Sequence, residues 1–210
     1  MSVIYDPATQ AHLTIDPAPK AARVTLYDAR AHASGRKNCY AAAMTTKLAL
    51  LDVNQSVFMV LFGADSRVVR VQRILVSVWP QLSGYIDVAV DQRTAPPTTG
   101  GAGRTLLAAV PLDIEAAPGA KSTVATYTTS PTGWDGGGTI ATLQRFATPL
   151  GTIGPHSFYD FDWRHRHESE APVLRGSNEA VTVGCVPNLG GGGGSPNVLG
   201  SIWWTEEERS

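Results

Sequence analysis

The 210 residues carry 17 Lys and Arg against 18 Asp and Glu, and this net charge of −1 offers no general attraction to nucleic acid or to an anionic membrane. Charged residues make up 17% of the chain, below the roughly 25% usual in soluble domains, while 21 Gly and 14 Pro are typical of a turn-rich β protein. We find neither a secretory signal nor an apolar stretch long enough to span a membrane. We therefore expect a chain that is made in the cytosol, stays soluble and has no nucleic-acid or membrane partner.

The first 35 residues differ in composition from the rest. Pro7, Pro17 and Pro19 punctuate them, and proline favours extended backbone. The segment has too little apolar surface to form a core of its own, so we predict an extended N-terminal arm over residues 1–35, with its best strand pattern at Arg23–Tyr27. The arm either frays as a tail or orders against a neighbouring subunit. The apolar residues available for that contact are Val3, Ile4, Tyr5, Leu13 and Ile15.

Three β-type runs follow in the middle of the chain, at Val57–Phe62, Arg67–Trp79 and Tyr85–Val90. The first is apolar throughout, the second is rich in β-branched residues, and the third alternates apolar with polar residues as a half-buried strand does. Because their connections are short, we predict that they pair as an antiparallel meander at the centre of the core. The residues expected to be buried are Val71, Ile74, Val88 and Ile202.

Shorter strand patterns continue to the C-terminus. The last two, Glu179–Val186 and Pro196–Glu206, flank the five glycines Gly190–Gly194, which we interpret as a hairpin loop. About ten to twelve irregularly spaced strands without an internal repeat indicate a sandwich. The predicted fold is all-β: an antiparallel β-sandwich of jelly-roll type over residues 36–210, preceded by the extended arm.

His165 and His167 would share one face of a strand, and the carboxylates of Asp160, Asp162, Glu168 and Glu170 are close in sequence. Such a set is conceivable as metal ligands. The alternating charges of this stretch are more typical of a solvated loop, so we predict no metal site. We consider instead that the two histidines form a pH-sensitive contact between subunits.

Trp134 lies in the turn Ser130–Gly138 and is expected to be exposed or half-exposed at its tip. It is the last of the candidate interface residues. Arg67, Arg70 and Arg73 recur along the second central run, on a wet strand face or at an interface, where Arg forms ion pairs better than Lys.

Motifs of catalysis or cofactor binding are absent from the sequence. The string GGAGRT, at residues 100–105, lacks the Lys-Ser/Thr ending of a phosphate-binding loop. We therefore predict no enzyme, no catalytic residue and no cofactor. The two cysteines, Cys39 and Cys185, have no metal-ligand spacing; two buried thiols are the preferred interpretation, and a disulfide is the alternative.

Short segments between residues 36 and 207 form an ordered series: Tyr40–Ala43, Ser66–Ile74, Ile86–Val88, Ala109–Asp113, Thr126–Thr128, Pro172–Gly176 and Trp204–Glu207. Together these segments resemble a family of tailed-bacteriophage structural proteins. The resemblance implies a virion component, made in the host cytoplasm, and it brings no catalytic residues. Residues 1–35 and the glycine run do not match the pattern.

These observations lead to two expectations about function. The first is a capsid decoration or cement protein that stabilises the head shell, binds the major capsid protein or other virion proteins, and assembles as a homo-oligomer, by analogy a trimer. The second is a tail, collar or fibre component with a receptor- or glycan-binding role. A virion enzyme such as a glycosidase is the least favoured.

Overall fold

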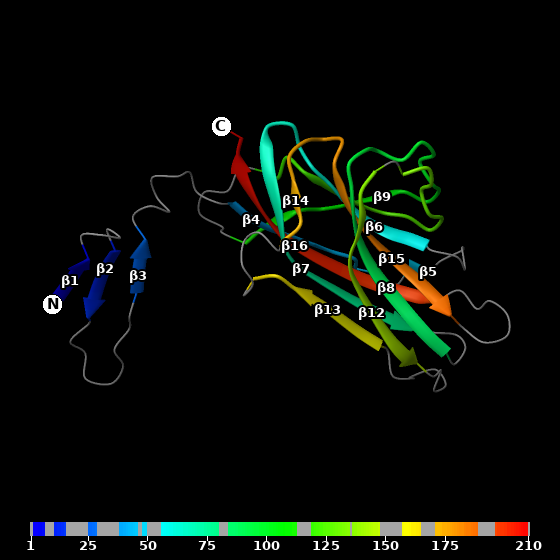
Figure 1. The fold of residues 1–210 in the computed structure, drawn as a ribbon, viewed down its shortest axis with the longest axis horizontal. Helices are drawn as coiled ribbons and strands as arrows, with labels where there is room; N and C mark the ends of the chain where they lie inside the picture. The colour runs from blue at the N-terminus through cyan, green and yellow to red at the C-terminus, as the bar shows by residue number, and fades with distance from the viewer. Residues whose placement is uncertain are drawn as a thin grey trace. The chain divides into compact units, whose positions relative to one another are not determined.

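The computed structural model divides into two compact units, Met1–Lys37 and Asn38–Ser210 (Figure 1). The regular elements among the described residues are β-strands, and within those residues no helix is long and apolar enough to cross a membrane. The structure describes residues 2–6, 11–15, 25–28, 38–45, 48–49, 56–79, 84–112, 119–134, 136–147, 157–164, 171–188 and 196–209.

The first unit contains a three-stranded antiparallel sheet in the order β1 (Ser2–Asp6), β2 (Ala11–Ile15) and β3 (Thr25–Asp28). Its register aligns Ile4 with Leu13 and Leu13 with Leu26. The predicted arm thus contains three extended strands that pair with one another, and each strand supplies backbone hydrogen-bond partners to its neighbour. Its contact with a neighbouring subunit stays a prediction.

The second unit is an antiparallel β-sandwich, which confirms the predicted fold class. Its two sheets are named after their long central strands; the jelly-roll connection stays a prediction. The β7 sheet has the order β10 (Val110–Pro111), β4 (Asn38–Ala43), β16 (Asn197–Glu208), β7 (Arg67–Trp79) and β13 (Ser157–Asp162), with β5 (Leu48–Ala49) also on β16 and β14 (Val173–Leu174) also on β7. The β8 sheet has the order β12 (Gly138–Ala147), β8 (Gly84–Arg93), β15 (Ala180–Asn188), β6 (Ser56–Phe62), β11 (Thr123–Thr126) and β9 (Thr105–Leu107).

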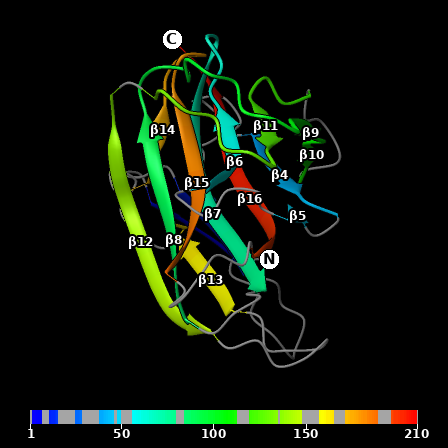
Figure 2. The same ribbon diagram turned by 90° about the vertical axis from the view of Figure 1, so that its right-hand side faces the viewer.

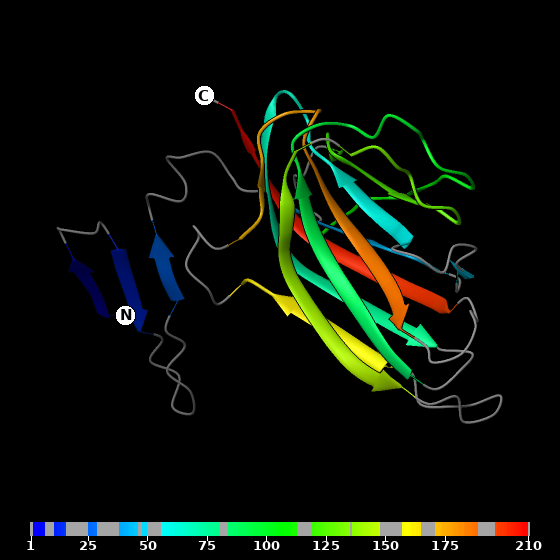
Figure 3. The same cartoon turned by 45° about the vertical axis from the view of Figure 1, so that its right-hand side comes forward.

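The strands of the predicted meander alternate between the two sheets, and the strands of the predicted C-terminal hairpin lie in opposite sheets, so both predictions are wrong. β6 and β8 belong to one sheet, where β15 separates them, and β7 belongs to the other. β15 and β16 are likewise in different sheets (Figure 3). The alternation of apolar and polar residues in a strand specifies which of its faces is buried, but it does not specify which strand lies beside it. Here β7 pairs with β16, and β8 pairs with β15, each over a long register.

The core lies between the two sheets, and Figure 2 shows these sheets from another side. Val71, Ile74, Val88 and Ile202 are completely buried in it, as predicted. Tyr159 from β13 reaches across the core and donates a hydrogen bond from its hydroxyl to the carbonyl oxygen of Ile86 in β8, at 3.0 Å. Burial raises the pKa of this hydroxyl, so it remains a donor at neutral pH.

A second, smaller apolar cluster lies outside the β8 sheet. Val57, Val60 and Ala180 contribute to it from the sheet, and Tyr127 and Trp134 from the segment that follows β11. We call residues 94–104 together with 127–134 the cap, because these two loops pair with each other and cover that part of the sheet. Their backbones are joined by several hydrogen bonds, among them Thr98 N to Gly133 O at 3.1 Å and Thr132 N to Thr99 O at 3.2 Å.

Candidate functional site: a pocket beside the cap

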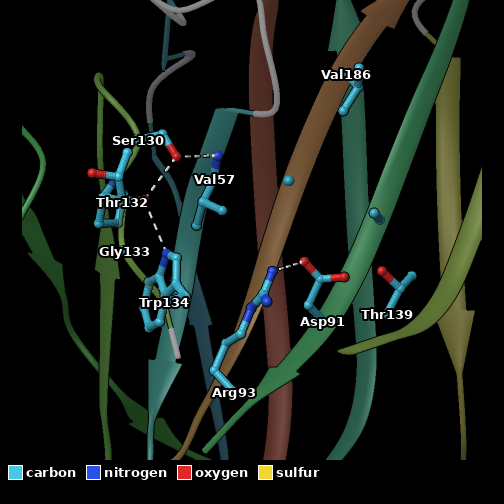
Figure 4. A pocket seen from close by; sticks show the side chains of 12 residues that line it. Val57, Asp91, Arg93, Ser130, Thr132, Gly133, Trp134, Thr139 and Val186 are labelled. Carbon is cyan, nitrogen blue, oxygen red and sulfur yellow. Dashed lines mark hydrogen bonds and ion pairs between the residues drawn. The ribbon is translucent and has the colours of Figure 1, made fainter. Parts of the chain in front are cut away.

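A pocket of about 410 Å³ lies where the cap meets the outer face of the β8 sheet (Figure 4). Residues of β6, β8, β12 and β15 line its floor, and the 130–134 segment of the cap forms its wall. Its size falls within the range of roughly 300–1,000 Å³ typical of small-molecule sites. The lining residues are Val57, Ala89, Asp91, Arg93, Ser130, Pro131, Thr132, Gly133, Trp134, Thr139, Gly184 and Val186.

The pocket exists because small residues meet in its floor. Ala89 of β8 and Gly184 of β15 are direct cross-strand partners, so neither strand fills the space above them. Gly184 also lies at a register irregularity between β15 and β6, after Val183. Such irregularities locally change the twist of a strand and re-aim its side chains.

The wall is held in place by hydrogen bonds within the cap. Ser130 Oγ accepts a hydrogen bond from the backbone amide of Val57 at 3.0 Å, which ties the wall to β6. The indole Nε1 of Trp134 donates to the carbonyl oxygen of Pro131 at 3.0 Å, and this bond orients the ring (Figure 4). Gly133 has a φ of 68°, a conformation that glycine adopts readily, and any side chain there would collide with Thr98.

An ion pair lines the opposite side of the pocket. Arg93 Nη2 lies 2.6 Å from Asp91 Oδ2, and the side chains are 23% and 15% exposed. Both residues project from the outer face of β8, because their neighbours Val88 and Val90 point into the core. Asp91 Oδ1 and Arg93 Nε are buried and have no hydrogen-bond partner among the described residues. The pair therefore has hydrogen-bonding capacity that the fold does not use.

Of the predicted interface residues whose side chains the structure describes, Trp134 lies in this pocket, and it is half-buried there. Asp91, Arg93, Ala89 and Gly184 are pocket residues that the sequence pattern did not single out. The predicted strand Tyr85–Val90 ends before Asp91 and Arg93, and its alternation puts Ala89 on the polar face without telling which strand lies beside it. Extending the alternation by three residues would have added Asp91 and Arg93 to that face.

The remaining predicted interface residues are only partly described. Val3, Ile4 and Tyr5 lie in β1, and Leu13 and Ile15 lie in β2, where the structure describes the backbone alone. His165 and His167 lie outside the described residues, as do Glu168 and Glu170.

The two aspartates that are close to those histidines in the sequence form hydrogen bonds with arginines. Asp160 accepts hydrogen bonds from Arg73 Nε and Nη2, at 2.9 and 2.6 Å. Asp162 accepts hydrogen bonds from the backbone amide of Arg164 at 2.9 Å and from its guanidinium Nε at 3.0 Å. These bonds and the nearby Arg73 lower the pKa of Asp162 well below its ordinary value of 3.8.

The arginines of β7 form ion pairs, as expected for a wet strand face. Arg67 pairs with Glu208 at 3.1 Å, and Arg70 pairs with Glu207 at 3.2 Å. Arg73 also lies over the ring of Trp203, at 5.9 Å from its centroid.

The two cysteines do not form a disulfide with each other. Cys39 is half-buried and Cys185 is fully buried. Cys39 belongs to β4 and Cys185 to β15, and these strands lie in different sheets. Burial raises the pKa of the Cys185 thiol to about 12.

Most of the exposed large apolar side chains among the described residues lie on or beside the strands at the two edges of the sandwich; Tyr85 in the inner strand β8, 50% exposed, is the exception. On one edge, Leu106 in β9 is 60% exposed and Val110 in β10 is 58% exposed, and Leu112 follows directly with 53%. We call these three residues the β9–β10 edge. On the opposite edge, Ile140 in β12 and Phe158 in β13 are 44% and 43% exposed.

Fold and site together define an all-β sandwich with one capped outer face and a small pocket beside the cap. Comparisons of the chain with models of protein families, with curated proteins and with solved structures find no match.

Proposed function

We propose that this chain is a non-enzymatic structural protein of a tailed-bacteriophage virion, and that it acts as a capsid decoration or cement protein. In this role it binds the major capsid protein or a neighbouring copy of itself and buries surface between shell subunits. The sequence resemblance supports the virion assignment. The observation that carries the binding role is the β9–β10 edge.

The β9–β10 edge brings together two outermost strands, one from each sheet. Exposed sheet edges pair readily with other chains, and proteins that remain monomeric protect them with charges or coverings. Here the chain passes from β9 directly to β10 and presents Leu106, Val110 and Leu112 on the way. Several exposed large apolar side chains at one edge favour a protein–protein contact there. A neighbouring subunit that covers it would stabilise an assembly without any reaction.

The first test is the copy number of the chain in purified particles, measured by quantitative mass spectrometry against the major shell protein. A copy number similar to that of the major shell protein supports decoration of the head. A copy number similar to that of tail proteins instead supports the second candidate below, and absence from particles contradicts both.

The second test concerns the edge itself. Val110→Lys places a charge in the β9–β10 edge and should weaken binding to particles that lack the protein by at least tenfold, because the charge would lose its water in the contact. Thr142→Lys is the matched control, since Thr142 is also exposed but lies in β12, at the opposite edge of the sandwich. Equal binding by the two variants would exclude this edge as the contact.

A tail, collar or fibre component that binds a receptor is the second candidate. The pocket beside the cap favours it, because a decoration protein that only covers a shell has no need of a small-molecule-sized pocket.

A further inference from the structure

We propose that the pocket beside the cap binds an uncharged sugar unit through Asp91, Arg93 and Trp134. This inference deepens the second candidate function and rests on it only for the biological source of the sugar. Binding itself is a property of the isolated chain.

The charge of the pocket selects a neutral ligand. Among the described residues, its lining contains one carboxylate and one guanidinium, held together at 2.6 Å, so their charges cancel. An anion would be opposed by Asp91 and a cation by Arg93. A hydroxyl group suits both, because it donates to a carboxylate and accepts from a guanidinium, and sugars carry such groups on adjacent carbons.

Some polar atoms on this face of the sheet lack the hydrogen-bond partners that a fold usually supplies to buried groups. Thr182 is the cross-strand partner of Asp91, and its hydroxyl oxygen is buried without a hydrogen-bond partner among the described residues. Together with Asp91 Oδ1 and Arg93 Nε, three unsatisfied polar atoms gather at neighbouring positions of one sheet face. Such atoms destabilise a fold, and apolar side chains in their place would cost less. Departures of this kind concentrate at functional sites.

The apolar part of the lining suits the ring of a sugar. Trp134 supplies a broad apolar surface, and its Nε1 is already occupied by Pro131 O, so the ring does not need to move on binding. Val57 and Val186 continue this surface across the floor. Preorganised side chains lose little entropy when a ligand binds.

A peptide is a poorer fit than a sugar. Extended peptides commonly bind by adding a strand to an exposed sheet edge. The floor of this pocket belongs chiefly to β8, β15 and β6, and each of these strands is already paired on both sides. Backbone pairing with a peptide is therefore not available at the floor.

The test uses the full chain with glucose, galactose, mannose and N-acetylglucosamine as probes, each at concentrations up to about 10 mM. Saturation-transfer NMR detects binding, and titration calorimetry measures the affinity. Arginine, glutamate and a short uncharged peptide serve as competing ligand classes. We expect saturable binding of at least one of the four sugars and no binding of arginine, glutamate or the peptide.

Three variants locate the binding. Asp91→Asn removes the charged acceptor, Trp134→Phe reduces the indole surface, and Ala89→Leu fills the floor; each should weaken sugar binding at least tenfold. Trp203→Phe is the matched control, because Trp203 is also a half-buried indole but lies in the other sheet, and it should bind normally. Circular dichroism verifies the fold of each variant. Thr139→Val replaces any that does not fold and should also weaken binding.

No binding of any of the four sugars overturns the proposal, as does binding that folded pocket variants retain in full. Binding of the peptide or of a charged probe in place of the sugars also overturns it. These outcomes leave the virion assignment untouched, since that assignment depends on the presence and copy number of the chain in particles.

Discussion

Glu206 in β16 accepts hydrogen bonds from both the backbone amide and the hydroxyl of Ser122, the residue directly before β11. The same carboxylate accepts from Lys121 N at 3.0 Å and from Trp204 Nε1 at 3.1 Å. Only 1% of Glu206 is exposed. Because β16 and β11 belong to different sheets, this buried carboxylate joins the two layers of the sandwich.

Glu206→Gln should lower the free energy of unfolding by about 1–3 kcal/mol, since the amide NH₂ of Gln cannot accept the hydrogen bonds that the lost oxygen accepted. Urea unfolding followed by fluorescence measures the difference. Glu208→Gln is the matched control on the same strand. Its side chain is 83% exposed, so we expect a change within about 0.5 kcal/mol. Equal effects of the two substitutions would show that the buried carboxylate does not join the sheets.

Val88→Asp should prevent folding. Val88 is fully buried between the sheets, and an unpaired buried carboxylate costs several kcal/mol, a large part of the roughly 5–15 kcal/mol that stabilises a domain. Soluble expression and circular dichroism provide the measurement. Ala89→Asp is the control, because the neighbouring side chain projects from the outer face and the variant should fold. A folded Val88→Asp protein would contradict the assignment of the buried face of β8.

Asp162→Asn should reduce stability at neutral pH by at most about 1 kcal/mol, because the pair with Arg164 is partly exposed and screened by solvent. The folded pKa of Asp162 lies below 3.8, so the charged form stabilises the fold above that pH, and this contribution is lost as the pH falls through the folded pKa. The difference between wild type and variant should therefore shrink in acid. Thermal unfolding at several pH values measures it, and a constant difference would count against the ion pair as its source.

The Cys185 thiol should not react with a thiol reagent in the folded protein. Its pKa is raised to about 12 by burial, so thiolate is scarce at pH 8 and the sulfur is inaccessible. The raised pKa also means that stability declines as the pH rises from 9 towards 12, because the unfolded thiol ionises first. Labelling of a Cys39→Ser variant with and without denaturant tests the first point. Rapid labelling without denaturant would place Cys185 at the surface.

Local pattern was enough to locate most strands and their buried faces. Alternation and β-branching alone predict that Val71, Ile74 and Val88 lie in the core, and each is fully buried. Alternation is informative because successive side chains in a strand point to opposite faces of the sheet. Every second residue therefore belongs to the same face. Broad composition in the same way predicted an all-β sandwich, which the structure confirms.

Which strands lie side by side was decided only in the folded chain. β6, β7 and β8 follow one another closely, yet β7 pairs with β16, more than a hundred residues away, because that arrangement buries the apolar faces of both sheets against each other. The pocket has the same origin. Ala89 meets Gly184 through strand pairing, and Trp134 reaches them from a separate loop. A local sequence pattern cannot predict these contacts, since they depend on the register of strands that are distant in the sequence.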